Sequence, residues 1–160
     1  MSSNLFVMER IGADTEYLDI VAPAGVYNGN VVNITGRNAN GTYQVSAPTA
    51  ITNNSLLMVL HEDLGYNAEY VNMDDVTFAT GAILRAAVLK VGNQVAIPVA
   101  NVTATATVEA DAFLIPDASA LKIECVSSLG GTESLALVVE GTFVKAGVTL
   151  VRARVIKAQV

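Results

Sequence analysis

Four short dipeptides made of glycine and asparagine constrain this chain more than any other feature. Because glycine and asparagine readily adopt the positive φ angles of two-residue hairpin turns, each dipeptide predicts a tight turn between two strands. Turns at these intervals favour short antiparallel strands over long helices. The dipeptides are Asn28-Gly29, Asn40-Gly41, Gly92-Asn93 and Gly130-Gly131.

The first two dipeptides lie among residues typical of strands. Asn28-Gly29 separates Tyr17–Tyr27 from Asn30–Thr35, and both segments carry branched aliphatic residues. Asn40-Gly41 then precedes Thr42–Val45. Because each turn should reverse the chain between adjacent strands, the first third of the chain is predicted to form a three-strand meander.

The third dipeptide raises a choice between strand and helix. We expect Gly92-Asn93 to join a strand within Phe78–Val91 to a second strand at Gln94–Val99, with Val88 facing Ile97. A strand is favoured because Gly81 precedes the first run and the turn leads directly into the second. The helical alternative rests on the apolar spacing of Leu84, Val88 and Val91.

The last third is predicted to continue the same pattern. Gly130-Gly131 is expected to link Leu121–Leu129 to Thr132–Glu140, and Val148–Lys157 reads as a closing strand because it is rich in β-branched residues. Asn101–Glu109 alternates like a strand but carries little bulk, so we expect it either to pack thinly or to lie at a sheet edge.

Composition excludes several classes of protein. Of the 160 residues, 52% are hydrophobic, 6% aromatic and 15% charged, which is far too apolar for a disordered chain. The longest apolar runs, Leu56–Leu60 and Leu135–Val139, fall short of the roughly 20 residues of a membrane-spanning helix. The net charge of −6 repels a phosphate backbone. We therefore expect neither a membrane nor a nucleic acid as a partner.

Two further features concern the cellular compartment. The start, Met1–Asn4, has neither a positive region nor a long apolar region, so no signal peptide is predicted. The single Cys125 cannot form an intramolecular disulfide, which fits a reducing cytoplasm. Its alternation with Leu121 and Ile123 predicts a buried, unreactive thiol.

These observations predict an all-β protein: a small β-barrel or sandwich of short antiparallel strands joined by hairpin turns, with room for one short helix. We divide the chain into residues 1–16 and a single β domain at residues 17–160. In the first part, Leu5, Phe6, Val7 and Met8 form an apolar cluster. This cluster is either a first strand that covers the core or an extended arm that packs on a neighbouring subunit.

Residues suited to catalysis or metal binding are sparse. His61-Glu62-Asp63 combines the chain's one histidine with carboxylates, but adjacent residues point in different directions and a metal site needs further ligands. Asp74-Asp75 lacks the alternating acidic loop of a calcium site and is read as a turn or helix start. Nucleophile elbows, Walker loops and dinucleotide fingerprints are absent from the sequence. We expect no enzymatic activity, metal or cofactor.

Two binding surfaces remain candidates. Arg152 and Arg154 share a face of the closing strand, with Lys145 and Lys157 near its ends. They form either an ordinary solvated face or a stripe that docks an acidic protein surface. A sugar-binding platform would need several tyrosines to converge, and the five available are Tyr17, Tyr27, Tyr43, Tyr66 and Tyr70.

The order of the segments resembles a known family. Three segments carry the resemblance: Glu16-Tyr17-Leu18 followed by Ala22-Pro23-Ala24-Gly25, then Phe78–Ala86 with its Gly92-Asn93 turn, and then Ala112–Pro116 before Leu121-Lys122-Ile123. From about Glu16 to Lys157, the chain is similar to the small head-decoration, or cement, proteins of tailed bacteriophages.

The resemblance implies a β-rich protein that oligomerises on the capsid exterior, with a trimer expected ahead of a dimer, and that clamps neighbouring subunits of the major capsid protein. It implies a location in the virion, after synthesis in the cytoplasm of a host bacterium, and no catalytic residue. The surplus of apolar residues agrees, because excess apolar surface usually marks a contact. Another virion part, such as a tail or coat subunit, and a non-catalytic carbohydrate- or ligand-binding module are the alternatives.

Overall fold

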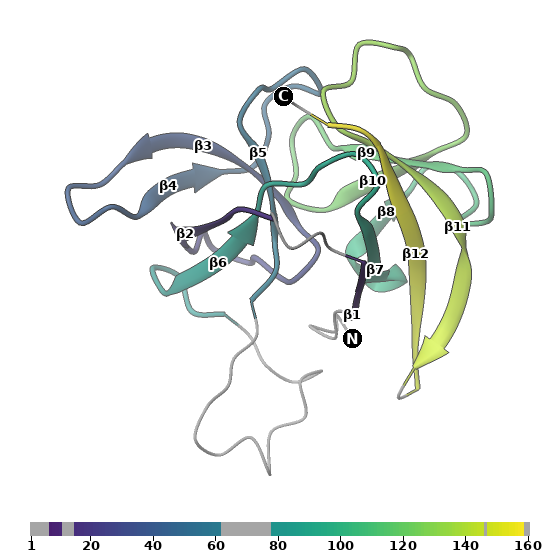
Figure 1. The fold of residues 1–160 in the computed structure, drawn as a ribbon, viewed down its shortest axis with the longest axis horizontal. Helices are drawn as coiled ribbons and strands as arrows, with labels where there is room; N and C mark the ends of the chain where they lie inside the picture. The colour runs from purple at the N-terminus through teal and green to yellow at the C-terminus, as the bar shows by residue number, and fades with distance from the viewer. Residues whose placement is uncertain (1–6, 11–14, 62–77, 146, 159–160) are drawn as a thin grey trace.

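The fold is seen in a computed structural model, which describes residues 7–10, 15–61, 78–145 and 147–158. The described chain is all-β, as predicted, and divides into a closed five-stranded barrel and an open seven-stranded sheet (Figure 1). Besides the strands, its regular structure is one short 3-10 helix, η2 (Val99–Asn101).

The barrel is built from the first half of the chain and one later strand. Its strands follow the order β2-β4-β3-β5-β6. β2 pairs in parallel with β4, and its other neighbour, β6, is antiparallel. The strands are β2 (Tyr17–Val21), β3 (Val31–Arg37), β4 (Tyr43–Ser46), β5 (Leu56–Val59) and β6 (Ile83–Ala87).

The open sheet follows the order β1-β7-β12-β11-β9-β10-β8, so β1 and β8 form its two edges. Its pairs are antiparallel except β10 with β8. The strands are β1 (Val7–Arg10), β7 (Gln94–Pro98), β8 (Val102–Ala104), β9 (Phe113–Pro116), β10 (Ile123–Val126), β11 (Ala136–Lys145) and β12 (Val148–Lys157).

Strand β5 separates two hydrophobic cores. It is buried throughout, because successive side chains of a strand point to opposite faces and both faces are covered. Leu57 and Val59 point into the barrel, where they pack with Ile20 and Leu84. Met58 points the other way, into the core between barrel and open sheet.

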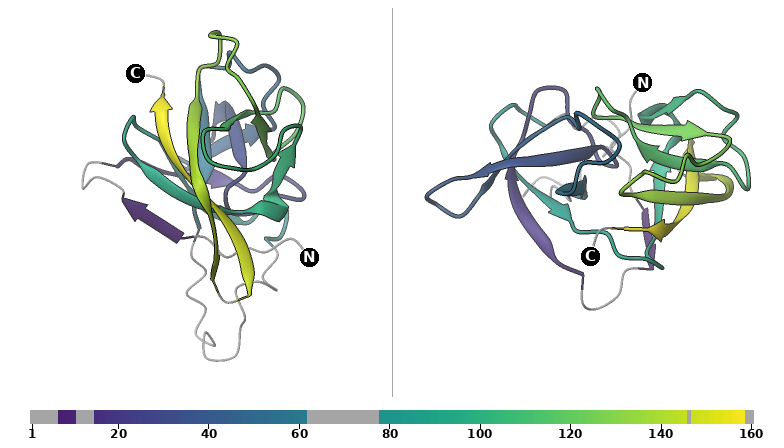
Figure 2. Two further views of the ribbon diagram at one scale, coloured as in Figure 1. Left: turned by 90° about the vertical axis from the view of Figure 1, so that its right-hand side faces the viewer. Right: turned by 90° about the horizontal axis from the view of Figure 1, so that it is seen from above.

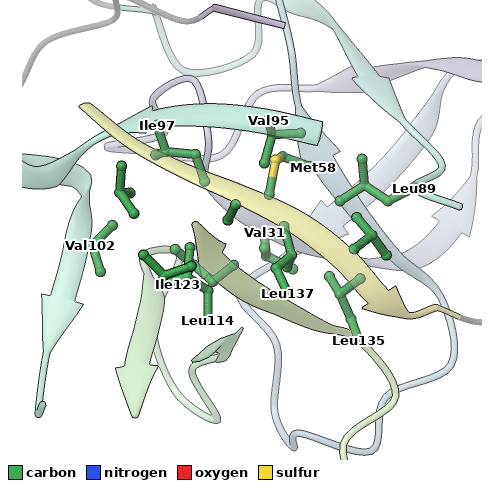
Figure 3. Close-up of a cluster of buried hydrophobic side chains, with 14 of the residues drawn as sticks. Val31, Met58, Leu89, Val95, Ile97, Val102, Leu114, Ile123, Leu135 and Leu137 are labelled. Carbon is green, nitrogen blue, oxygen red and sulfur yellow. The ribbon is translucent and has the colours of Figure 1, made fainter. Parts of the chain in front are cut away.

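The second core is the larger one and joins the two sheets. Figure 3 shows its side chains, among which Met58 comes from the barrel and Val95, Leu114 and Leu137 come from the open sheet. All four are completely or almost completely buried. Much of the apolar surplus in the sequence is therefore used inside the chain, in a second core that a single barrel would not provide.

The turn at Asn40-Gly41 joins two paired strands, as predicted: β3 and β4 form an antiparallel hairpin. The prediction for Asn28-Gly29 is wrong in its pairing. A turn is present there, but β2 and β3 are separated in the barrel by β4, so the three strands do not form a meander.

The Asn28-Gly29 turn instead connects the barrel with the open sheet. The side chain of Asn28 donates to the carbonyl of His61 and accepts from the His61 amide, at 2.9 and 2.8 Å. Asn101 Nδ2 donates to the Asn28 carbonyl at 3.2 Å. Gly29 lies against Ile97, and a Cβ at this glycine would come within 2.5 Å of Ile97 Cγ2.

Two other hairpin predictions also need correction. The strand preferred over a helix within Phe78–Val91 is present as β6, but it belongs to the barrel while β7 belongs to the open sheet. Val88 and Ile97 are therefore not cross-strand partners, and Gly92-Asn93 links two sheets. Gly130-Gly131 lies in the connection from β10 to β11, which are separated by β9.

Three predictions for the second half of the chain are confirmed. The closing strand occupies Val148–Lys157 as β12, and the thin segment within Asn101–Glu109 forms the edge strand β8. Cys125 is buried on β10, as expected from its alternation with Ile123.

The N-terminal cluster is described in part. Val7 and Met8 belong to β1, whose backbone pairs with β7 at the sheet edge, with Val7 opposite Ala96 and Met8 opposite Val95. Leu5 and Phe6 lie outside the described residues. A first strand added to the open sheet is therefore present over Val7–Arg10, and a role for this strand between subunits stays a prediction.

Candidate interaction surface on the β11–β12 ribbon

The longest hairpin in the described part of the chain extends beyond its neighbouring strands. β11 and β12 pair along their whole length, from Ala136 opposite Lys157 to Lys145 opposite Val148. On one side β9 pairs with β11 at Leu137 and Val138, and on the other β7 pairs with β12 from Leu150 to Arg154. We call residues 141–145 and 147–149 the ribbon tip, which projects past the rest of the open sheet (Figure 2, left).

A β-bulge marks the base of this tip. Val139 lies opposite Ala153, and the next pair is Gly141 opposite Arg152. Glu140 is therefore the extra residue of the bulge. Gly141 has a φ of +148°, a conformation that side-chain-bearing residues rarely adopt. Bulges re-aim side chains and increase strand twist. Here the side chain of the bulged Glu140 reaches residues of β12 and of β7, the strand beyond it.

Glu140 binds a side chain from each of these strands. Gln94 Nε2 donates to one carboxylate oxygen at 2.8 Å, and the Arg154 guanidinium donates to the other. Arg154 remains half exposed in this ion pair. Exposed ion pairs contribute little stability, so the pair mainly fixes where the guanidinium lies.

Arg152 and Arg154 lie on the same face of β12, as the alternation predicted. Val151, Ala153 and Val155 point into the core between the sheets, whereas the two arginines point away from it. The Arg152 guanidinium lies 4.9 Å from the centre of the Phe143 ring. Lys145 lies on this face as well, because it pairs with Val148, four residues before Arg152. We call Lys145, Arg152 and Arg154 the basic face.

The opposite face of the ribbon tip carries an exposed apolar side chain. Val144 is 68% exposed and lies opposite Thr149. A second exposed apolar group lies at the other end of the ribbon, where Val91 is 65% and Ile156 is 40% exposed. The turn carrying Val91 is held there by two backbone hydrogen bonds: the Gly92 amide donates to the Val155 carbonyl, and the Val155 amide donates to the Asn93 carbonyl. Both ends of the ribbon therefore offer apolar contact surface.

A buried carboxylate holds the loop before β11. Glu133 is 2% exposed, and its oxygens accept the amides of Gly130 and Gly131. The pKa of Glu133 is lowered by hydrogen bonding to its own backbone amide, opposed by burial, and lowered further by those two amides and by the charge of Lys157. Lys157 in turn donates to the Gly131 carbonyl at 3.0 Å.

The other sequence candidates lie apart from this surface. His61 Nδ1 accepts the Arg85 amide at 3.2 Å, and its ring meets Phe78 edge-on. Glu62, Asp63 and Asp74-Asp75 lie outside the described residues. Within the described ranges, no three His, Cys, Asp or Glu side chains gather as metal ligands.

Two of the tyrosines that the structure describes, Tyr17 and Tyr43, do not share a platform. Tyr43 packs against the barrel core, with Arg37 over its ring. Tyr17 is exposed on β2 and stacks with Arg85. Tyr43 pairs with the inward-facing Ile20, so these two tyrosines lie on opposite sides of the barrel wall. Tyr66 and Tyr70 lie outside the described residues.

Sequence reasoning missed the partners of the arginines. It found the alternation of Arg152 and Arg154 but not Glu140, Gln94 or Phe143. The available signal was Gly141 directly after Glu140 within a strand-like run, because an isolated glycine in a strand often marks a bulge.

Comparison of the chain with family models, with curated proteins and with solved structures found no match. Over the part of the chain that the structure describes, no helix is long and apolar enough to cross a membrane.

Proposed function

We propose that this protein is a structural subunit of a tailed-bacteriophage virion, which oligomerises on the capsid exterior and stabilises contacts between major capsid subunits. The β11–β12 ribbon is the observation that carries the proposal. Its tip extends beyond the open sheet and presents Val144 at 68% exposure. A two-stranded ribbon is marginally stable by itself in water, so docking against a partner would stabilise it.

The mechanism is adhesive. A decoration subunit that contacts two or more capsid subunits binds only their assembled state. By mass action, such binding raises the free energy needed to separate them. The apolar side of the ribbon tip, with Val144 between Thr142 and Thr149, would contact the capsid. The two-core body would hold the ribbon in a fixed orientation.

Two matched variants test the role of the tip in capsid binding. Val144→Asp removes the exposed apolar group of the tip, and Ile83→Asp makes the same kind of change on the barrel surface, where Ile83 is 50% exposed. Expanded capsids lacking the protein are mixed with each variant and sedimented. We expect the wild type and Ile83→Asp to pellet with capsids at a fixed ratio and Val144→Asp to stay in the supernatant.

Other results would refute the proposal or assign the protein to another part of the virion. If the wild type does not pellet with capsids at any concentration, capsid decoration is refuted, and pelleting with isolated tails would assign the protein to that part of the virion. If both variants bind like the wild type, the ribbon tip is not the capsid contact. Circular dichroism checks that each variant keeps the β fold.

A further inference from the structure

The outer edge of β11 is open at the ribbon tip. β9 and the loop before it bond to β11 as far as Val139, whose carbonyl accepts the Asp111 amide. Among the residues that the structure describes, no backbone group pairs with β11 from this side between Gly141 and Lys145. An unpaired strand edge is a ready template for a strand from another chain.

The register shows which backbone groups face this open edge. Val155 exchanges backbone hydrogen bonds with the turn before β7, so its amide and carbonyl point away from β11. Backbone direction alternates along a strand, which gives Val151 and Thr149 the same outward direction. Their opposite residues on β11 are Thr142 and Val144. Because opposite residues of an antiparallel pair point their groups either toward or away from each other, Thr142 and Val144 direct theirs to the open edge.

We infer that this edge of β11 pairs antiparallel with the same edge of a second copy of the chain, about a two-fold axis at Phe143. Thr142 of each copy then lies opposite Val144 of the other, and the two residues exchange both of their backbone hydrogen bonds. The inference deepens the proposed function and rests on it, because it names the contact through which a decoration protein would oligomerise.

The side chains of the edge suit pairing with a second copy. Phe143 lies opposite itself in a non-hydrogen-bonded pair, where side chains approach most closely and aromatic pairs stabilise a sheet. Lys145 lies opposite the second copy's Gly141, next to that copy's Glu140, so opposite charges meet at both ends of the contact. Thr142, Phe143 and Val144 all favour strands, and no proline blocks the edge.

The contact is isologous, because the same edge of each copy binds the other, and such a contact closes after two copies. It therefore predicts a dimer in place of the trimer that the family resemblance implies. Successive side chains of a strand alternate between faces, so Thr142 and Val144 lie on the face opposite Phe143. Pairing brings Val144 of both copies onto one face and enlarges the apolar surface offered to the capsid.

Two matched proline variants test the edge by sedimentation velocity over a range of protein concentrations. Thr142→Pro removes an outward amide from the open edge of β11, and Thr149→Pro removes one from the opposite edge of the same ribbon. Both threonines are exposed, and neither amide faces the other strand of the hairpin, so both variants keep the ribbon. We expect the wild type and Thr149→Pro to dimerise with similar affinity. Thr142→Pro should dimerise at least about tenfold more weakly, because each dimer loses two hydrogen bonds.

Cysteine cross-linking tests the register of the contact. The two Cα atoms of a non-hydrogen-bonded antiparallel pair lie about 4.5 Å apart, within the range that a disulfide spans. Phe143→Cys should therefore give a disulfide-linked dimer under mild oxidation, seen on a non-reducing gel. Thr149→Cys, on the far edge of the ribbon, should stay monomeric on the same gel. The native Cys125 is buried in both variants.

Three results would overturn the inference: a wild type that forms no dimer at any concentration, a Thr149→Pro variant weakened as much as Thr142→Pro, or a Phe143→Cys variant that cross-links no more than Thr149→Cys. These outcomes are distinguishable from failure of the proposed function. A monomeric wild type that still pellets with capsids would refute the contact between copies and leave capsid decoration standing. A dimer that depends on the β11 edge but does not pellet would do the reverse.

Discussion

The contact between the Asn28-Gly29 turn and strand β7 can be tested by adding a single methyl group. Gly29 has a φ of +85°, and a Cβ there would lie 2.5 Å from Ile97 Cγ2. Gly41 has a similar φ of +90°, but a Cβ at that position would meet nothing within 4 Å. Gly29→Ala and Gly41→Ala therefore differ mainly in the contact with the open sheet.

The expected magnitudes follow from these two environments. The left-handed conformation costs a side-chain-bearing residue about 1–2 kcal/mol, so Gly41→Ala should lower the free energy of unfolding by about that amount. Overpacking a filled core costs about 1–3 kcal/mol more. Gly29→Ala should therefore cost about 2–5 kcal/mol in total.

Urea unfolding followed by circular dichroism measures these differences, and a double-mutant cycle isolates the contact. Ile97→Ala removes the Cγ2 atom that a new Cβ would meet. In that background Gly29→Ala should cost only about 1–2 kcal/mol, the share due to backbone conformation. Two results would show that the turn does not pack tightly against β7. One is a loss in the free energy of unfolding for Gly29→Ala that is no larger than the loss for Gly41→Ala. The other is a loss for Gly29→Ala that is unchanged in the Ile97→Ala background.

Three further predictions concern the interior. Met58→Ala should lower the free energy of unfolding by about 2–5 kcal/mol in urea titrations, because Met58 is fully buried where the two sheets meet; a loss under about 1 kcal/mol would contradict its central place. Cys125 should react with a thiol reagent only after denaturation, because burial raises its pKa; rapid reaction of the native protein would show an open thiol. The fold lowers the pKa of Glu133, so its ionised carboxylate stabilises the protein at pH values above the ordinary glutamate range. This stabilisation is lost as the pH falls through that range toward the lowered pKa, so the advantage of the wild type over Glu133→Gln in thermal melts should shrink between about pH 7 and pH 3. A difference that stays constant with pH would contradict the role of the carboxylate.

The sequence predicted the fold class and most turn positions, but few of the strand pairings. Turn chemistry is local: Gly29, Gly41 and Gly92 all adopt positive φ, as their dipeptides indicated. Pairing depends on distant contacts, and of those three turns the one at Gly41 joins strands that pair with each other. The other two carry the chain from one sheet position to another, which no local pattern distinguishes from a hairpin.

The second core escaped prediction for a related reason. A continuous apolar run such as Leu56–Leu60 is consistent with a strand covered on both faces, but the run does not name what covers it. The candidate surface was also predicted only in part. Alternation placed Arg152 and Arg154 on one face, while the Glu140 bulge that organises them depends on the register between β11 and β12.

The central claim, that the protein stabilises assembled capsids, is tested most directly by the melting temperature of expanded capsids with and without saturating protein. Binding to the assembled state alone predicts a higher melting temperature, an increase that rises with protein concentration, and saturation at a fixed number of copies per capsid. An unchanged melting temperature under conditions in which the protein pellets with the capsids would contradict the account, because the bound protein would then add nothing to the contacts between capsid subunits.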